Sequence, residues 1–310
     1  MAGAAGAGAR WRVFLSHTSE LRNFPDGGKS YIAEAERGES RRVIADGLYR
    51  ASTSPSALIA SVCRMTSPVP DPAARAEELG ERVDVASARV LATAAGISDE
   101  QAREPSSLPG WSRGHVLTHL ARNADGLRNL LIWARTGVVT PQYPSFEVRN
   151  EEIEAGAGRP ARELVVDFAD SATAFEAETA RLRDGHWAAE VHGVRGAAHP
   201  AWYTLWRRLS ELEIHHVDLD AGYRPADWPA DFARECLQGA TASFSGPDSP
   251  AALLRATDDG SEHRIGPPGE EPAITLAGQS YALLAWLLGR SDGSGLSATP
   301  TGPLPPVPPW

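Results

Sequence analysis

The sequence predicts an α+β protein in which a four-helix bundle is followed by a small α/β domain. Two observations lead to this class. Between Arg75 and about Tyr223, apolar residues recur at intervals of three and four, as they do on helices that bury one face. After Pro225 the chain changes to short apolar segments separated by turn-forming residues. We therefore expect the bundle over residues 69–223 and the second domain over residues 224–310.

The first 68 residues carry too little apolar sequence for a domain of their own. They hold a Gly/Ala-rich leader, one apolar run at residues 13–15 and a Ser/Pro-rich segment. Burial of so few apolar side chains cannot offset the loss of chain entropy on folding. The segments WRVFLSHTSELRNFP and SYIAEAER resemble the first strand and helix of a TIR-like domain, but its later strands have no counterpart. We expect an incomplete, poorly ordered fragment or linker, with Met65 as an alternative start.

Four helical segments make up the predicted bundle. The first two are indicated by apolar residues at helical spacing: Leu79, Val83, Val90 and Leu91, and then Val116, Leu117, Leu120, Leu127, Leu130 and Leu131. The third spans about residues 160–182, and the fourth spans about residues 201–220, where Gly222 supplies a stop. Longer connections with Gly and Pro, such as residues 137–147, indicate at least one crossover.

The C-terminal region alternates turn-forming and apolar sequence. DDG at residues 258–260 and PPGEEP at residues 267–272 indicate turns, and SYALLAWLLGR indicates a compact helix that ends at Arg290. The prolines of the final TGPLPPVPPW exclude a helix there. We expect this segment to lie extended across the surface, with Trp310 as an anchor.

The composition favours a small-molecule partner. The formal net charge is −10, whereas a nucleic-acid or anionic-membrane partner would require a basic face. No segment has the roughly 20 consecutive apolar residues of a membrane span, and the N-terminal sequence is too short and polar for a signal peptide. We expect a cytoplasmic monomer or weak homo-oligomer. Cys63 and Cys236 have no CxxC partner, so any reactive thiol should come from another molecule.

Two of the predicted helices carry candidate metal ligands. Glu211 and His215 are four residues apart, so their side chains leave the same face of the fourth helix about one turn from each other. His115 and His119 repeat this spacing on the second helix, among apolar residues that place at least one of them near the bundle interior. Two histidines and one glutamate leave the fourth position of a zinc ion open, which is typical of a catalytic site. The hypothesis is a metal site formed by His119, Glu211 and His215 on facing helices.

The same residues also have a purely structural interpretation, because HxxxH and ExxxH pairs are common in helices. Glu211 would then be a solvated helix residue, and His119 a hydrogen-bonded core histidine. His215 and His216 would pack near the end of their helix.

Three neighbouring residues are candidates for supporting the metal ligands. His115 lies in the first turn of its helix, where a surface or supporting role is favoured over ligation. His216 points about 100 degrees away from His215 on an ideal helix, so both cannot easily bind one ion. We assign His115, His216 and Asp218 to contacts around the ligands or to the structure itself.

Four long motifs lie in order between about Pro70 and Trp310. They are PSSLPGWSRGHVLTHLARNADGLRNLLIWARTG, RNEEIEAGAGRPARELVVDFADS, WRRLSELEIHHVDLDAGYRPADWP, and GQSYALLAWLLGR with the terminal PLPPVPPW. Together they closely resemble the mycothiol-dependent maleylpyruvate isomerase family. The resemblance implies a DinB-like four-helix bundle with a small C-terminal α/β domain. It also implies zinc held by the His of HVLTHL and by the Glu and His of ELEIHH, which are His119, Glu211 and His215.

The resemblance further implies a catalytic arginine in the C-terminal domain, at the position of Arg290. An ordinary cation at a helix C-terminus is the alternative interpretation. In the implied reaction, the thiol of mycothiol is held as a thiolate on zinc and adds to the cis double bond of maleylpyruvate. Rotation and elimination then give fumarylpyruvate. The developing enolate and the two carboxylates of this dicarboxylate substrate need cations, for which Arg290 and Arg208 are candidates.

Two other functions remain open at this point. One is a mycothiol S-transferase that uses the same thiolate on electrophilic xenobiotics. The other is a non-catalytic metal-binding or signalling bundle. The first differs from the isomerase in its substrate, and the second in having no turnover.

Overall fold

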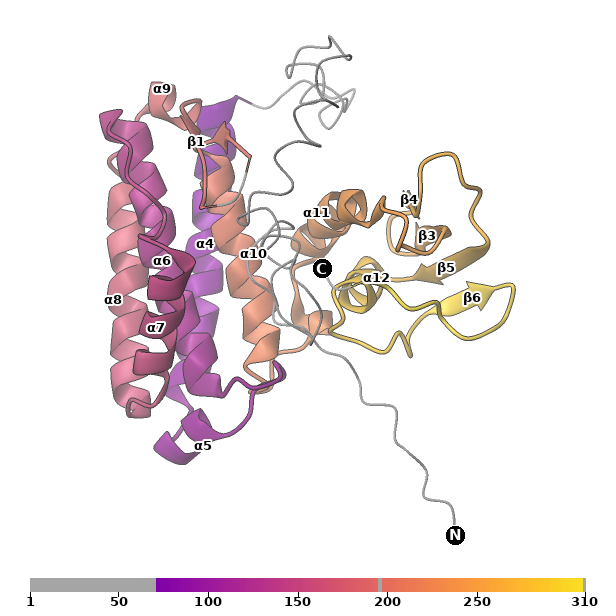
Figure 1. Cartoon of the computed structure of the whole chain (residues 1–310), viewed down its shortest axis with the longest axis horizontal. Helices are drawn as coiled ribbons and strands as arrows, with labels where there is room; N and C mark the ends of the chain where they lie inside the picture. Colours follow the sequence, from indigo (N-terminus) through magenta and orange to yellow (C-terminus); the bar gives the residue numbers. More distant parts are fainter. Residues whose placement is uncertain (1–70, 195–196, 309–310) are drawn as a thin grey trace, which may run out of the picture.

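The computed structural model describes residues 71–194 and 197–308. The predicted TIR-like fragment at residues 1–68, the alternative start at Met65 and the anchor at Trp310 lie outside the described residues. Figure 1 shows a helical bundle beside a smaller domain that contains a sheet, which confirms the predicted α+β class. None of the described helices is long and apolar enough to cross a membrane.

Four long helices form the bundle: α4 (Pro72–Ala95), α6 (Arg113–Thr136), α8 (Ala161–Thr179) and α10 (Tyr203–Asp218). Helix α6 packs on α8 and α10, and α4 packs on the same two helices, so α4 and α6 occupy opposite corners. Leucine, valine and phenylalanine side chains at helical spacing fill the space between them.

Short elements connect the bundle helices: α5 (Asp99–Arg103), α7 (Phe146–Ala157), α9 (Asp184–Trp187), β1 (Glu190–Val191) and β2 (His199–Pro200). Helices α6 and α8 both begin at the end of the bundle near α5, so they run in the same direction (Figure 1). The chain between them therefore crosses back along the bundle, as predicted. This connection contains α7, a helix that the sequence analysis did not predict.

The C-terminal domain is a four-stranded mixed sheet with two helices. Its elements are η2 (Pro225–Asp227), α11 (Ala230–Thr241), η3 (Ala242–Phe244), β3 (Ala252–Ala256), β4 (Glu262–Ile265), β5 (Ile274–Gly278), α12 (Ser280–Leu287) and β6 (Ser297–Thr299). The strand order is β4-β3-β5-β6. The central pair, β3 and β5, is parallel, and both outer pairs are antiparallel. The predicted turns at 258–260 and 267–272 connect β3 to β4 and β4 to β5.

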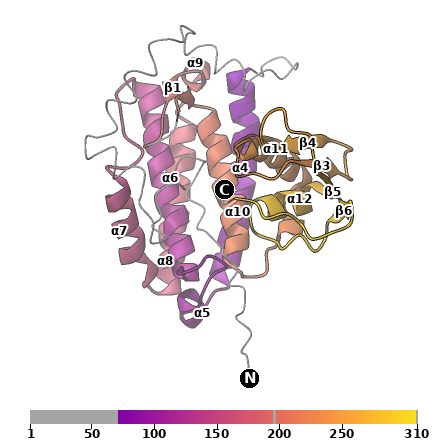
Figure 2. The same cartoon turned by 45° about the vertical axis from the view of Figure 1, so that its right-hand side comes forward.

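Helix α10 lies between the other helices of the bundle and the C-terminal domain. Figures 1 and 2 place α11 and α12 between α10 and the sheet. The ring of Trp206 on α10 lies 5.8 Å from the ring of Phe232 on α11. As a result, every residue of α10 except Tyr203 is buried. Its charged side chains must therefore find partners inside the protein, because an unpaired buried charge is costly.

Candidate metal centre

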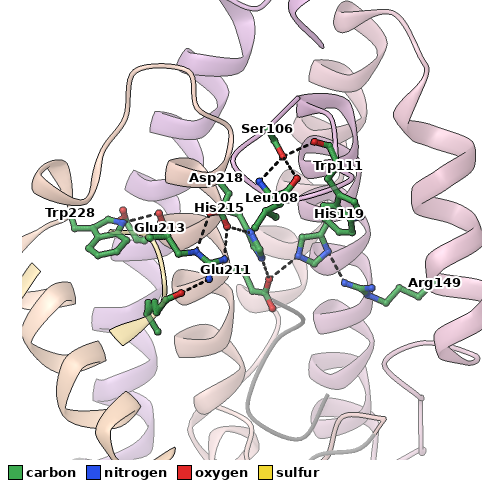
Figure 3. Close-up of polar contacts among 12 residues, drawn as sticks. Ser106, Leu108, Trp111, His119, Arg149, Glu211, Glu213, His215, Asp218 and Trp228 are labelled. Carbon is green, nitrogen blue, oxygen red and sulfur yellow. Dashed lines mark hydrogen bonds and ion pairs between the residues drawn. The ribbon is translucent and has the colours of Figure 1, made fainter. Parts of the chain in front are cut away.

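The side chains of His119, Glu211 and His215 converge inside the bundle. His119 lies in the second turn of α6, and Glu211 and His215 lie one turn apart on α10 (Figure 3). The Nε2 atom of His119 is 2.9 Å from Oε2 of Glu211, and the Nε2 atom of His215 is 3.2 Å from the same oxygen. The three potential ligand atoms lie within 4.8 Å of one another. All three side chains are buried, so the fold holds them away from bulk water.

Asp218 connects His215 to the C-terminal domain. Its Oδ2 atom is 2.9 Å from Nδ1 of His215, the ring nitrogen that faces away from Glu211. Arg290 donates to the same carboxylate from two nitrogens, with Nη2 2.8 Å from Oδ2 and Nε 3.1 Å from Oδ1. A carboxylate behind a histidine ligand fixes the orientation of the ring. The C-terminal domain therefore reaches the site through Arg290 and Asp218.

Arg149 contacts the ring nitrogen of His119 that faces away from Glu211. Its Nη2 atom donates to Nδ1 of His119 over 2.9 Å, and its guanidinium lies 5.8 Å from the centre of the Tyr143 ring. A role for Arg149 was not predicted from the sequence, because the helix that carries it, α7, was not predicted. Its position at the start of the motif RNEEIEAGAG could have indicated a role in the site.

The electrostatics of the site favour an ionised carboxylate between the two histidines. Burial lowers the pKa of His119 to about 3, so this ring is neutral. Burial also opposes protonation of His215, but hydrogen bonds to Asp218 and Glu211 outweigh it and raise the pKa. Burial alone would raise the pKa of Glu211, yet hydrogen bonds from both histidines hold this pKa well below its usual range. The ionised carboxylate of Glu211 is therefore suited to binding a cation.

Comparison with known proteins identifies the family. Residues 83–220 match the family model described as the mycothiol maleylpyruvate isomerase N-terminal domain, and residues 227–309 match the MDMPI C-terminal domain. This chain belongs to the mycothiol-dependent maleylpyruvate isomerase family. Two crystal structures, of the mycothiol-dependent maleylpyruvate isomerase and of a histidine-to-alanine mutant of it, each match with a TM-score of 0.71 and 27% identity. Each match covers 76% of this chain and 97% of the other. No curated protein matches the chain.

The three converging residues of this maleylpyruvate isomerase family member fit a divalent metal ion. Ligand atoms about 2.1 Å from a tetrahedral zinc ion lie ~3.4 Å apart, close to the 2.9 and 3.2 Å separations measured from Glu211 Oε2. The other oxygen of Glu211, Oε1, is buried and has no hydrogen-bond partner among the described residues. A buried carboxylate oxygen without a partner is suited to binding a cation. Three protein ligands would leave one position open.

Arg208 lies one turn before Glu211 and is fully buried. Its Nη1 atom donates to the carbonyl oxygen of Leu120 over 2.8 Å and to Oδ1 of Asn123 over 2.9 Å. Burial lowers the pKa of Arg208 to about 10, which still leaves it charged at neutral pH. The structure therefore brings this predicted residue into the interior near the metal centre.

The structure places His115 at the N-terminus of α6, where it caps the helix. Its Nδ1 atom accepts the backbone N–H of Ser112 over 3.1 Å, and its ring stacks on Trp111. Trp111 also lies 5.6 Å from the His119 ring, so this tryptophan connects His115 to the metal centre.

The structure places His216 on the side of α10 that faces α4. Its Nε2 atom is 2.7 Å from Oγ1 of Thr93, and its ring stacks on Tyr223 at a centroid distance of 3.8 Å. These contacts direct the ring away from the three converging ligands, as the 100-degree rotation between neighbouring helix residues requires.

Proposed function

We propose that this enzyme converts maleylpyruvate to fumarylpyruvate, with mycothiol as its thiol cofactor and a zinc ion held by His119, Glu211 and His215. The observation that carries the proposal is the buried convergence of these three side chains within 4.8 Å on the fold of this family. Two histidines and a carboxylate are a common catalytic zinc ligand set, and the fourth position is available to a thiol.

The proposed chemistry is addition and elimination of a thiol. A zinc ion at this site would supply the positive charge that lowers the pKa of a thiol and keeps it as the nucleophilic thiolate. Addition of this thiolate to the cis double bond would move the electron pair of that bond into the conjugated carbonyl as an enolate and would leave a carbon–carbon single bond, which can rotate. Elimination would return the electron pair as the trans double bond and release the same thiolate, so that no atoms are gained or lost.

The chain's own residues prepare the site for this chemistry. Asp218 lies 2.9 Å from Nδ1 of His215 and would accept its proton when a metal ion is bound, so that Nε2, beside Glu211, could give its lone pair to the ion. Arg290 is engaged by both oxygens of Asp218. We therefore assign Arg290 to positioning Asp218 and His215, in addition to the catalytic role that the family resemblance implies.

The proposal is tested by turnover of maleylpyruvate with and without mycothiol, followed through loss of the cis-enol absorbance. We expect isomerisation that requires mycothiol and stops when a chelator removes the metal. Conjugation of mycothiol to electrophiles without isomerisation would contradict the proposal and favour the S-transferase. Absence of both activities in the metal-loaded enzyme would contradict the catalytic interpretation altogether.

A further inference from the structure

Three buried arginines near the metal centre form no ion pair with a carboxylate among the described residues, and the carboxylates of Glu211 and Asp125 act on Arg208 only from a greater distance. Arg149, Arg207 and Arg208 are only 2%, 6% and 0% exposed. All their hydrogen bonds go to neutral acceptors, which are two histidine nitrogens, three amide oxygens and a backbone carbonyl: His119, His199, Asn150, Gln142, Asn123 and Leu120. By contrast, Arg290 is paired with both oxygens of Asp218.

The lack of a direct ion pair needs an explanation, because a buried guanidinium that contacts no carboxylate costs free energy. The cost is greatest at Arg208, whose Nε and Nη2 atoms also lack a hydrogen-bond partner among the described residues. The amide nitrogen of Asn123, which adjoins Arg208, is likewise buried without a partner. These atoms are all N–H donors. A group of unsatisfied donors with excess positive charge is suited to an anion.

Arg149 and Arg208 are both close to the metal centre. Arg149 donates to His119, and Arg208 lies one helical turn from Glu211. Tyr143 is near both arginines, since its ring lies 5.8 Å from the Arg149 guanidinium and its hydroxyl interacts electrostatically with Arg208. An anion held by these two side chains would therefore lie beside the candidate metal ligands.

Metal binding would also release a donor of Arg149. A neutral histidine carries one ring proton, so when Nε2 of His119 gives its lone pair to a cation, the proton is on Nδ1. Nδ1 can then no longer accept the hydrogen bond from Arg149. The guanidinium thus gains a free N–H group beside the loaded site.

We propose that Arg149 and Arg208 bind the two carboxylates of a dicarboxylate substrate, with Arg207 adding positive charge nearby. The identity of that substrate and the released donor of Arg149 rest on the proposed function, whereas the donors of Arg208 and Asn123 without a partner do not. A planar guanidinium holds a carboxylate through two parallel hydrogen bonds and stays charged at all relevant pH values. Arg290 is less available to bind a substrate carboxylate, because its guanidinium already donates to both oxygens of Asp218.

The proposal is tested by titrating maleate, a dianion, and isocrotonate, its cis monoanionic counterpart, into the zinc-loaded full chain without thiol. Isothermal titration calorimetry would compare the wild type with Arg149→Gln and Arg208→Gln. The matched control is Arg255→Gln, which removes the same charge from an exposed pair with Glu262. We expect each site variant to weaken maleate binding by roughly tenfold or more and to lose the preference for maleate over isocrotonate. The control should bind like the wild type.

Thermal unfolding distinguishes a binding role from a structural one. If the arginines bind an anion, maleate raises the melting temperature of the wild type but not of the variants. Without maleate, the variants should melt at or above the wild-type temperature, because an uncompensated buried charge has been removed. Arg208→Lys keeps the charge and should retain part of the maleate affinity, which provides a second test if Arg208→Gln does not fold.

Maleate affinity in either glutamine variant equal to that of the wild type would overturn the proposal, as would a wild type that does not bind maleate. This failure is distinguishable from failure of the proposed function. Binding of maleate through these arginines without isomerisation of maleylpyruvate would support the anion site and contradict the proposed function. Normal isomerisation by the wild type, together with normal maleate binding by the variants, would contradict only the anion site.

Discussion

At the scale of single residues, Asp218 is the group through which the metal centre and the C-terminal domain meet. Burial alone would raise the pKa of its carboxyl group, but the charge of Arg290 and the hydrogen bond from His215 lower it. Asp218 is therefore ionised at neutral pH. A carboxylate whose folded pKa is lowered stabilises the fold above its unfolded pKa, and this stability is lost as the pH falls through the folded pKa.

We predict that Asp218→Asn weakens zinc binding by about 10- to 100-fold, the usual cost of losing a carboxylate behind a histidine ligand. The amide keeps the size of the side chain but loses the charge that orients His215 and pairs with Arg290. Competition with a chromophoric chelator at neutral pH measures the change. Glu262→Gln removes a surface carboxylate paired with Arg255 and is the matched control. Equal zinc affinity in Asp218→Asn and the control would show that Asp218 does not support the metal.

At the scale of elements, the site depends on the close approach of α6 to the segment that follows it. A Cβ atom at Gly114 on α6 would lie 2.2 Å from the carbonyl oxygen of Ala157 at the end of α7. A Cβ atom at Gly126 would lie 2.5 Å from the Tyr143 ring. Only glycine allows these approaches without movement of the chain. They keep α7 against α6, where Arg149 reaches His119.

We predict that Gly114→Ala lowers the free energy of unfolding by about 1–3 kcal/mol, because the added methyl group collides with backbone that cannot rotate away. Denaturant unfolding of the metal-free protein measures the change. Gly80→Ala in α4 is the matched control, since no atom lies within 4 Å of the added Cβ. There the better helix propensity of alanine should stabilise the fold by about 0.5–1 kcal/mol. Similar effects of the two substitutions would contradict the proposed close contact.

The elements that were predictable from sequence are those with long apolar patterns. The predicted helices at 160–182 and 201–220 correspond to Ala161–Thr179 and Tyr203–Asp218. Helix α7 was missed because it has only 12 residues and its buried face includes an arginine and a glycine instead of an apolar stripe.

The helical spacing of Glu211 and His215 was sufficient to place them on one face, but their distance to His119 is a property of helix packing. The pairing of Arg290 with Asp218 depends on how two domains meet, which no local pattern encodes. The sequence also could not predict that Arg149 and Arg208 form no ion pair with a carboxylate among the described residues, because burial and hydrogen bonding are known only from the folded chain.

At the scale of the whole molecule, the C-terminal domain acts as a support for α10. The indole N–H of Trp228 donates to the backbone oxygen of Glu213 over 2.9 Å, and Arg290 reaches Asp218 from the same domain. The chain as a whole carries a formal net charge of −10, yet unpaired arginines are concentrated beside the metal centre. This separation of charge is consistent with the small dianionic substrate that we propose.

Metal analysis is the direct test of whether His119, Glu211 and His215 bind one catalytic metal ion. The protein is purified without added metal, and its metal content is measured by inductively coupled plasma mass spectrometry for the wild type and for Glu211→Gln. We predict about one zinc ion per wild-type chain and less than roughly a tenth of that in the variant, with an unchanged circular dichroism spectrum. A wild type that neither contains nor takes up a divalent metal, or a Glu211→Gln variant that retains stoichiometric zinc, would contradict the account.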